Sequence, residues 1–126
     1  MKLLVVEDSA LIRTVTRLAF PSRDHEIQEA ADGQQALALL DASSERFDAI
    51  LLDLRMPGMN GVEFIRALRE RPRHRDTPIV VATSEAETSE LVQEARRLGV
   101  AAVVKTPWTP QDLARVVQSC IDRRQG

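Results

Sequence analysis

Residues 3–6 of the chain are LLVV, and this short apolar run has three counterparts: AILL at 49–52, IVVA at 79–82 and AAVV at 101–104. Apolar residues follow one another in these runs without alternating polar residues. Continuous runs of this length are typical of strands covered on both faces, as in a parallel sheet between helices. A weaker run at 25–30 contains Glu26, Gln28 and Glu29, which predicts a strand at the sheet edge.

Helical patterns separate the apolar runs. Thr109 suits a helix cap and Pro110 the first helical position, and the apolar residues that follow recur on one helical face. Strand and helix alternate five times, which predicts one doubly wound α/β domain over residues 1–126, with a five-stranded parallel sheet, five flanking helices and right-handed crossovers. Two other predicted helices cover 10–20 and 34–42. A third is opened by the capping-box pair Asn60 and Glu63, and a fourth is terminated by Gly99.

Composition narrows the possible functions. The 126 residues suit one domain, and 44% hydrophobic with 29% charged residues is unlike a disordered chain. A net charge of -2 provides no global attraction to nucleic acid or to an anionic membrane. Cys120 is the only cysteine, which excludes an internal disulfide and favours a cytoplasmic location. From the net charge we expect no nucleic acid as a partner. No apolar run is long enough for a signal peptide or a membrane span, so we also expect no membrane partner.

Polar residues directly follow four of the apolar runs. Glu7 and Asp8 follow the first, Asp53 the run at 49–52, Thr83 the run at 79–82 and Lys105 the last. In an open α/β sheet the carboxyl ends of the strands form the ligand-binding crevice, so these side chains should converge there. Taken singly, each residue has a plainer explanation as a helix cap, a turn residue or a surface charge. The joint pattern at four strand ends favours a functional site.

The chemistry of this set points to phosphoryl transfer. Three carboxylates in one pocket repel one another, and a hard divalent cation such as Mg²⁺ relieves that repulsion. Lys105 and Thr83 can hold phosphate oxygens through an ammonium and a hydroxyl. Such groups stabilise a phosphoryl group in transit, and a carboxylate is an established acceptor for it.

Four segments together resemble a known family. VVEDSALIR at 5–13, ILLDLRMPGMNG at 50–61, IVVATSEA at 79–86 and AVVK at 102–105 are similar to a response-regulator receiver domain of the single-domain chemotaxis (CheY-like) type. The resemblance covers essentially the whole chain, and the segment around Asp53 is its most specific part. It implies a flavodoxin-like sheet with strand order 2-1-3-4-5.

The resemblance also implies roles for the site residues. Asp53 would be the phosphoacceptor, and Thr83 and Lys105 would contact the phosphoryl oxygens, with Lys105 paired to Asp53 before phosphorylation. The implied Mg²⁺ ligands are Asp53, Asp8 directly, Glu7 mainly through water, and Arg55 through its backbone carbonyl.

Partners follow from the same resemblance. The donor would be a phosphohistidine on a sensor histidine kinase or a phosphotransfer protein of a two-component phosphorelay. The phosphorylated domain would bind a downstream protein at the face formed by the fourth helix, fifth strand and fifth helix. The chain would then be no enzyme beyond self-catalysed phosphoryl transfer and slow autodephosphorylation.

The chain departs from the family pattern near its end. Thr106 separates Lys105 from Pro107 and Trp108, although the family usually places Pro directly after Lys. Ala102 stands where many relatives have a Tyr or Phe that moves when the hydroxyl residue engages phosphate. The usual aromatic output switch is therefore missing, and Trp108 is a candidate to replace it.

Other functions compete with this interpretation. A receiver without an output switch would serve as a phosphate sink or as a degenerate receiver. A phosphohydrolase similar to the haloacid-dehalogenase family would use Asp53 as nucleophile but needs a second Asp two residues later, where this chain has Arg55. A flavin carrier of the same layout would not explain three carboxylates at the site.

Two further features have plainer interpretations. Cys120 falls on the apolar face of the last helix, which predicts a core residue. A basic stretch should lie at the opposite end of the sheet from Asp53, and a solvated helix face is favoured over a docking patch for it. Its members are Arg66, Arg69, Arg71, Arg73, His74 and Arg75.

Overall fold

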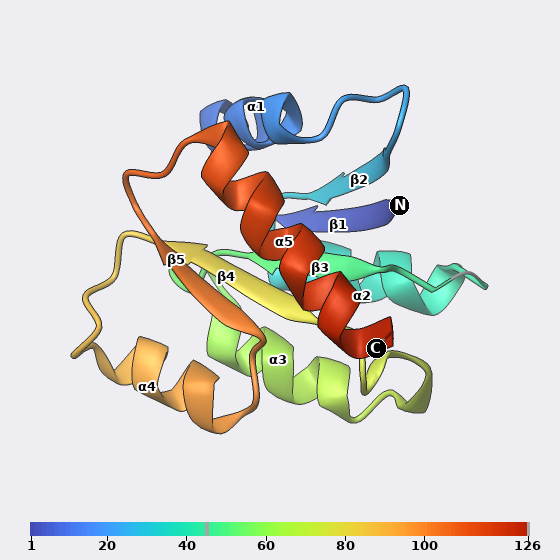
Figure 1. Ribbon diagram of the computed structural model, residues 1–126. Coiled ribbons are helices and arrows are strands. Elements are labelled where there is room, and N and C mark those ends of the chain that lie inside the picture. Colours follow the sequence, from blue (N-terminus) through green and yellow to red (C-terminus); the bar gives the residue numbers. More distant parts are fainter. Residues whose placement is uncertain (45, 126) are drawn as a thin grey trace.

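A computed structural model describes residues 1–44 and 46–125, so Gly126, the end of the predicted domain, lies outside the described residues. Five strands form one parallel sheet in the order β2-β1-β3-β4-β5, which confirms the predicted fold class (Figure 1). The weak run supplies edge strand β2, as its polar residues predicted. The elements are β1 (Lys2–Val6), α1 (Ala10–Ala19), β2 (Glu26–Ala30), α2 (Gly33–Ala42), β3 (Ala49–Leu52), α3 (Gly61–Arg69), the 3-10 helix η1 (Pro72–His74), β4 (Ile79–Thr83), α4 (Glu90–Arg97), β5 (Ala102–Lys105) and α5 (Pro110–Gln125).

Helices cover both faces of the sheet, and each face has its own apolar core. In β1, Leu4 and Val6 join the core shared with α2, α3 and α4, whereas Leu3 and Val5 join the core shared with α5. Helix α1 lies beside α5 on that second face (Figure 1). Cys120 is buried there, as predicted. Because both faces are covered, the central strands are continuous apolar runs.

Strand β5 begins and ends one residue later than its apolar run predicted. Its ladder pairs Val80 with Ala102 and Thr83 with Lys105. Lys105 therefore lies within the last position of the strand, directly beside Thr83 at the carboxyl edge of the sheet. The added Thr106 follows the paired residues and leaves this register intact, and its N–H donates to the Thr83 carbonyl at 3.1 Å.

The turn that leads from β3 into α3 is fixed by two local devices. Asn60 and Glu63 form the predicted capping box, with both hydrogen bonds at 2.9 Å. Gly61 packs against the end of β3 so closely that a Cβ there would lie 2.7 Å from the Asp53 carbonyl oxygen and 2.7 Å from Leu54 Cα. The close approach holds the segment after Asp53 against the sheet.

The basic stretch at the end of α3 is only in part the solvated face that was favoured, because Arg66, Arg73 and Arg75 are exposed whereas the other members are at least partly buried. Arg66 forms an ion pair with Glu94 of α4 at 2.6 Å, and Arg71 pairs with Asp41 of α2 at 2.7 Å. Arg69 Nη1 donates to the backbone carbonyls of residues 74, 75 and 77. Arg66 and Arg71 find carboxylates because α2 and α4 flank α3 and present them at its sides.

Candidate functional site

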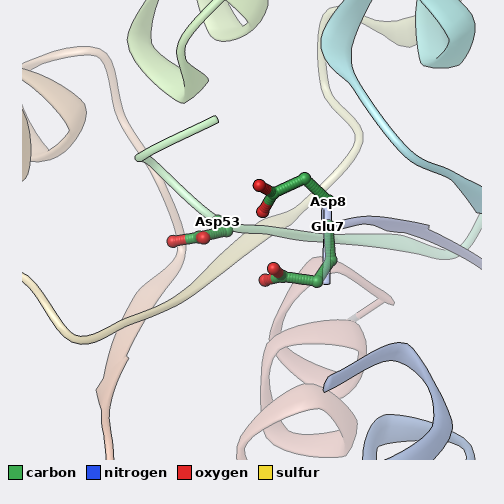
Figure 2. Close-up of side chains that lie close together, drawn as sticks. All are labelled: Glu7, Asp8 and Asp53. Atoms are coloured by element: carbon green, nitrogen blue, oxygen red, sulfur yellow. The ribbon is translucent and has the colours of Figure 1, made fainter. Parts of the chain in front are cut away.

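The acidic residues that follow β1 and β3 meet at the carboxyl edge of the sheet. Glu7, Asp8 and Asp53 each offer a carboxylate oxygen, and these oxygens lie within 4.8 Å of one another. Figure 2 shows the three carboxylates directed toward the same space beyond the strand ends. The β1–β3 ladder brings them together, since the Asp53 N–H donates to the Val6 carbonyl at 3.1 Å.

The three carboxylates differ in burial. Glu7 is buried at 8% exposure, Asp53 is half-buried and Asp8 is exposed. Burial is the main cause that raises the pKa of Glu7 to about 8, and the negative charges of Asp53 and Asp8 raise it further. A hydrogen bond from the Ser9 N–H at 3.1 Å acts in the opposite direction and lowers this pKa. Burial, with the nearby charge of Asp8, also raises the pKa of Asp53.

This donor set fits a hard divalent cation. It consists of oxygen atoms only, and its crowding disfavours ionisation of all three carboxylates unless positive charge is added. The main chain of Arg55 also lies close, because its N–H points to Asp53 Oδ1 at 3.5 Å. The acidic cluster is thus compatible with divalent metal binding.

Thr83 shares one cavity with two of the three carboxylates, those of Glu7 and Asp53. A hollow of about 290 Å³ is lined by Glu7, Asp53, Thr83 and Trp108, with Ile12 of α1 on its wall. Thr83 is buried, and its Oγ1 accepts a hydrogen bond from the Glu85 N–H at 3.1 Å. Trp108 is half-buried and packs on the core beside α5, so it lies at both the cavity and the core.

The predicted pairing of Lys105 with Asp53 is not what the structure shows. Lys105 Nζ donates instead to the main-chain carbonyl of Glu85, and no ion pair joins it to Asp53 among the described residues. Glu85 is also tied to the segment after Asp53, because the Arg55 guanidinium forms an ion pair with the Glu85 carboxylate at 2.8 Å.

Glu85 is the site residue that sequence reasoning missed. It contacts Thr83 through its N–H, Lys105 through its carbonyl and Arg55 through its carboxylate. Ser89, the N-cap of α4, also donates to that carboxylate at 3.2 Å. Its only sequence signal is a position two residues after Thr83, in a segment without periodicity. Arg55 and Glu85 are 30 positions apart in the sequence, so their contact exists only in the folded chain.

Comparison with known proteins now decides the family. The model of the response regulator receiver domain matches residues 3–118. The chain belongs to this receiver family. It is 33% identical over 131 residues to the chemotaxis protein CheY of Pseudomonas aeruginosa, with both chains covered completely. It is also 35% identical over 123 residues to the transcriptional regulatory protein ResD of Bacillus subtilis, covering 97% of this chain and 48% of ResD.

Solved receiver structures agree with the fold. The chemotaxis response regulator CheY4 of Vibrio cholerae superposes with a TM-score of 0.83 at 36% identity, covering 94% of this chain and 97% of that one. The receiver domain of sensor histidine kinase PA1611 from Pseudomonas aeruginosa, solved with a magnesium ion coordinated in its active site cleft, gives 0.84 at 27% identity over 96% of this chain and 97% of that one. In the described part of this receiver domain, no helix has the length and apolar character needed to cross a bilayer.

Proposed function

We propose that this receiver domain accepts a phosphoryl group on Asp53 from a phosphohistidine of a sensor histidine kinase or a phosphotransfer protein, in a Mg²⁺-dependent reaction. The observation that carries the proposal is the convergence of Glu7, Asp8 and Asp53 within 4.8 Å, with Thr83 on the wall of the same cavity and Lys105 beside it in the ladder. The magnesium ion in the PA1611 receiver structure supports the choice of metal.

Asp53 is the nucleophile in this reaction. One of its carboxylate oxygens bonds to phosphorus while the bond from phosphorus to the donor histidine nitrogen breaks, and that nitrogen keeps the electron pair and takes up a proton. Water later attacks phosphorus and releases inorganic phosphate, which restores the carboxylate. Half-burial of Asp53 leaves one side open to the donor and later to water.

The carboxylates and the cations around Asp53 set the charge of the site. Mg²⁺, when bound by Glu7, Asp8, Asp53 and the backbone carbonyl of Arg55, supplies the positive charge that offsets the carboxylates and the phosphoryl oxygens. Lys105 adds a further cation once its ammonium leaves the Glu85 carbonyl. The Thr83 hydroxyl donates to a phosphoryl oxygen. When it turns toward that oxygen, it loses the hydrogen bond that it accepts from the Glu85 N–H in the unphosphorylated protein.

Signalling then follows from binding and not from turnover of a soluble substrate. Glu85 begins the segment that leads to α4, so movement of Thr83 and Lys105 toward the phosphoryl group releases two of its contacts. The face formed by α4, β5 and α5 adjoins this segment (Figure 1) and is where we place the downstream protein. The kinase, the receiver and its target would meet in the cytoplasm.

A second candidate function is a degenerate receiver that binds partners without phosphorylation. The observation that favours it is the position of Lys105, whose ammonium contacts the Glu85 carbonyl and not Asp53. A receiver with this arrangement fixed would lack the Lys105 ammonium as a partner for the phosphoryl oxygens. One experiment separates the two candidates.

We expect incubation with acetyl phosphate and Mg²⁺ to add one phosphoryl group to the protein, measured as intact mass. Asp53→Asn should abolish the gain, since an amide oxygen is a far weaker nucleophile, and omission of Mg²⁺ should reduce it at least about tenfold because the charge of the phosphoryl group is then poorly offset. Asp122→Asn, at an exposed position on α5, is the matched control and should be phosphorylated like the parent protein.

No gain of mass in the parent protein would overturn the proposal in favour of the degenerate receiver. A gain that persists in Asp53→Asn would place the acceptor elsewhere. Trp108 fluorescence, followed in the same samples, should change on phosphorylation because this ring lines the cavity with Asp53 and Thr83.

A further inference from the structure

The end of the sheet opposite Asp53 contains a second hollow that the phosphoryl chemistry does not use. It has a volume of about 590 Å³ and lies where β4 and β5 begin and α5 ends. Pro78 and Ala101 precede the two strands, and Cys120 of α5 forms part of its wall. The hollow is wide and open to solvent, so a small ligand could reach it directly.

The charge of this hollow is strongly positive. Four arginines line it, namely Arg69, Arg75, Arg123 and Arg124, and among the described residues that line it Asp76 is the one that carries a carboxylate. They come from α3, from the segment before β4 and from the last turn of α5, so three separate parts of the chain bring positive charge to one place. This concentration contrasts with the net charge of -2 of the whole protein.

Two of the four arginines have side chains without a partner among the described residues. Arg69 is engaged by backbone carbonyls, and Arg123 Nη2 contacts Cys120 Sγ at 3.2 Å. Within residues 1–44 and 46–125, the guanidinium groups of Arg75 and Arg124 form no hydrogen bond or ion pair, and Arg75 is hydrogen-bonded only through its backbone. Elsewhere on the surface, arginines find carboxylates, as Arg55, Arg66 and Arg96 do. The free guanidinium groups offer flat, paired donors that match phosphate or carboxylate oxygens.

Thr77 provides an independent sign of a missing partner. Thr77 is 1% exposed and is one of the residues that line the hollow, and its buried Oγ1 has no hydrogen-bond partner in the described structure. Buried hydroxyl groups in folded proteins are nearly always hydrogen-bonded, to protein, water or ligand. A donor of this kind beside unpaired arginines is suited to an anionic oxygen.

We propose that this hollow binds a small anion of the diphosphate class, held by Arg75, Arg123 and Arg124, with the Thr77 hydroxyl donating to one of its oxygens. The Asp76 carboxylate repels an anion and attracts the arginines. A ligand with at least two negative groups therefore binds the arginines better than one with a single negative group. The site is at the opposite end of the sheet from Asp53 and is independent of the phosphoryl-transfer proposal.

Calorimetric titration of the full chain with inorganic pyrophosphate tests this site, at low ionic strength and with a chelator that removes divalent cations. We expect one binding site, and the double variant Arg75→Gln/Arg124→Gln should weaken it at least about tenfold, as expected when charge-assisted hydrogen bonds are lost. The matched control is Arg23→Gln/Arg115→Gln, which removes the same charge from exposed side chains outside the hollow and should change the affinity less than about threefold.

Thr77→Val, which keeps the shape of the side chain, should weaken pyrophosphate binding about threefold or more by removal of the hydroxyl. Asp53→Asn should bind as the parent protein does. Thermal unfolding verifies that each variant is folded. Absence of binding by the parent protein, equal losses in the two double variants, or loss in Asp53→Asn would overturn the proposal. Titration with adenosine diphosphate then distinguishes a nucleotide, which should bind more tightly than pyrophosphate, from an inorganic diphosphate.

Discussion

At pH 8 and without divalent cations, the Glu7→Gln protein is expected to be more stable than the parent protein by roughly 2 to 4 kcal/mol. Glu7 is buried beside Asp8 and Asp53, and its carboxylate must ionise there at a pKa of about 8. Glutamine keeps the size of the side chain and an oxygen that can accept the Ser9 N–H. It removes only the charge.

The sign of the pH dependence follows from the raised pKa. The folded state holds the proton of Glu7 up to about pH 8, whereas the unfolded chain releases it near the ordinary value of 4.5. The folded state therefore binds more protons between these values, and stability falls as pH rises from about 4.5 to about 8. Below this window the parent protein and Glu7→Gln should have similar stability.

Urea unfolding at pH 5 and pH 8, in chelator and in Mg²⁺, measures these differences. Mg²⁺ should stabilise the parent protein more at pH 8 than at pH 5, because cation binding needs ionised carboxylates. It should stabilise Glu7→Gln less. Glu26→Gln, the same change at an exposed position of β2, is the control and should be nearly neutral at both pH values. A parent protein with equal stability across the window would contradict the assigned burial of the Glu7 charge.

Replacement of Gly61 by alanine is expected to destabilise the fold by about 3 kcal/mol or more. The new Cβ would lie 2.7 Å from the Asp53 carbonyl oxygen and 2.7 Å from Leu54 Cα, and both atoms belong to the backbone at the end of β3. Neither can move without disturbing the ladder or the Gly61 N–H bond to the Leu54 carbonyl at 2.8 Å. The strain should also displace Asp53 and slow its phosphorylation.

Gly99→Ala separates this steric effect from the general loss of a glycine. Gly99 ends α4 with φ of +85°, and nothing lies within 4 Å of an added Cβ. The left-handed conformation costs an alanine about 1 kcal/mol, so Gly99→Ala should be clearly more stable than Gly61→Ala. Urea unfolding of the two variants gives the comparison, and equal losses would contradict the close approach at Gly61.

The strands could be predicted from the sequence because each one is buried on both faces. Residues 49–52 coincide with β3, and the polar edge run coincides with β2 to within one residue. The meeting of Glu7, Asp8 and Asp53 was predictable for the same reason, since parallel topology places neighbouring strand ends together. These features depend only on burial pattern and strand order.

Side-chain partners across the fold could not be predicted in the same way. The Lys105 ammonium was expected to pair with the Asp53 carboxylate, but it donates to the main-chain carbonyl of Glu85, a residue whose side chain pairs with Arg55. The basic stretch after α3 was expected to face solvent, yet Arg71 reaches Asp41 of α2. Each pairing depends on the distance between two elements that are far apart in sequence, and no periodicity within one segment encodes that distance.

The β4–β5 register divides the end of the chain into a part of fixed length and a part whose length can vary. Side chains on a strand alternate between faces, so an insertion between Ala102 and Lys105 would turn the ammonium away from Thr83. An insertion after Lys105, such as Thr106, falls beyond the last pair and leaves the ammonium in place. The connection from Lys105 to α5 can therefore change in length without a shift of the strand register, but its residues Thr106, Pro107 and Trp108 line the cavity beside Asp53, so such a change alters the wall of the acceptor site and not its floor of strand ends.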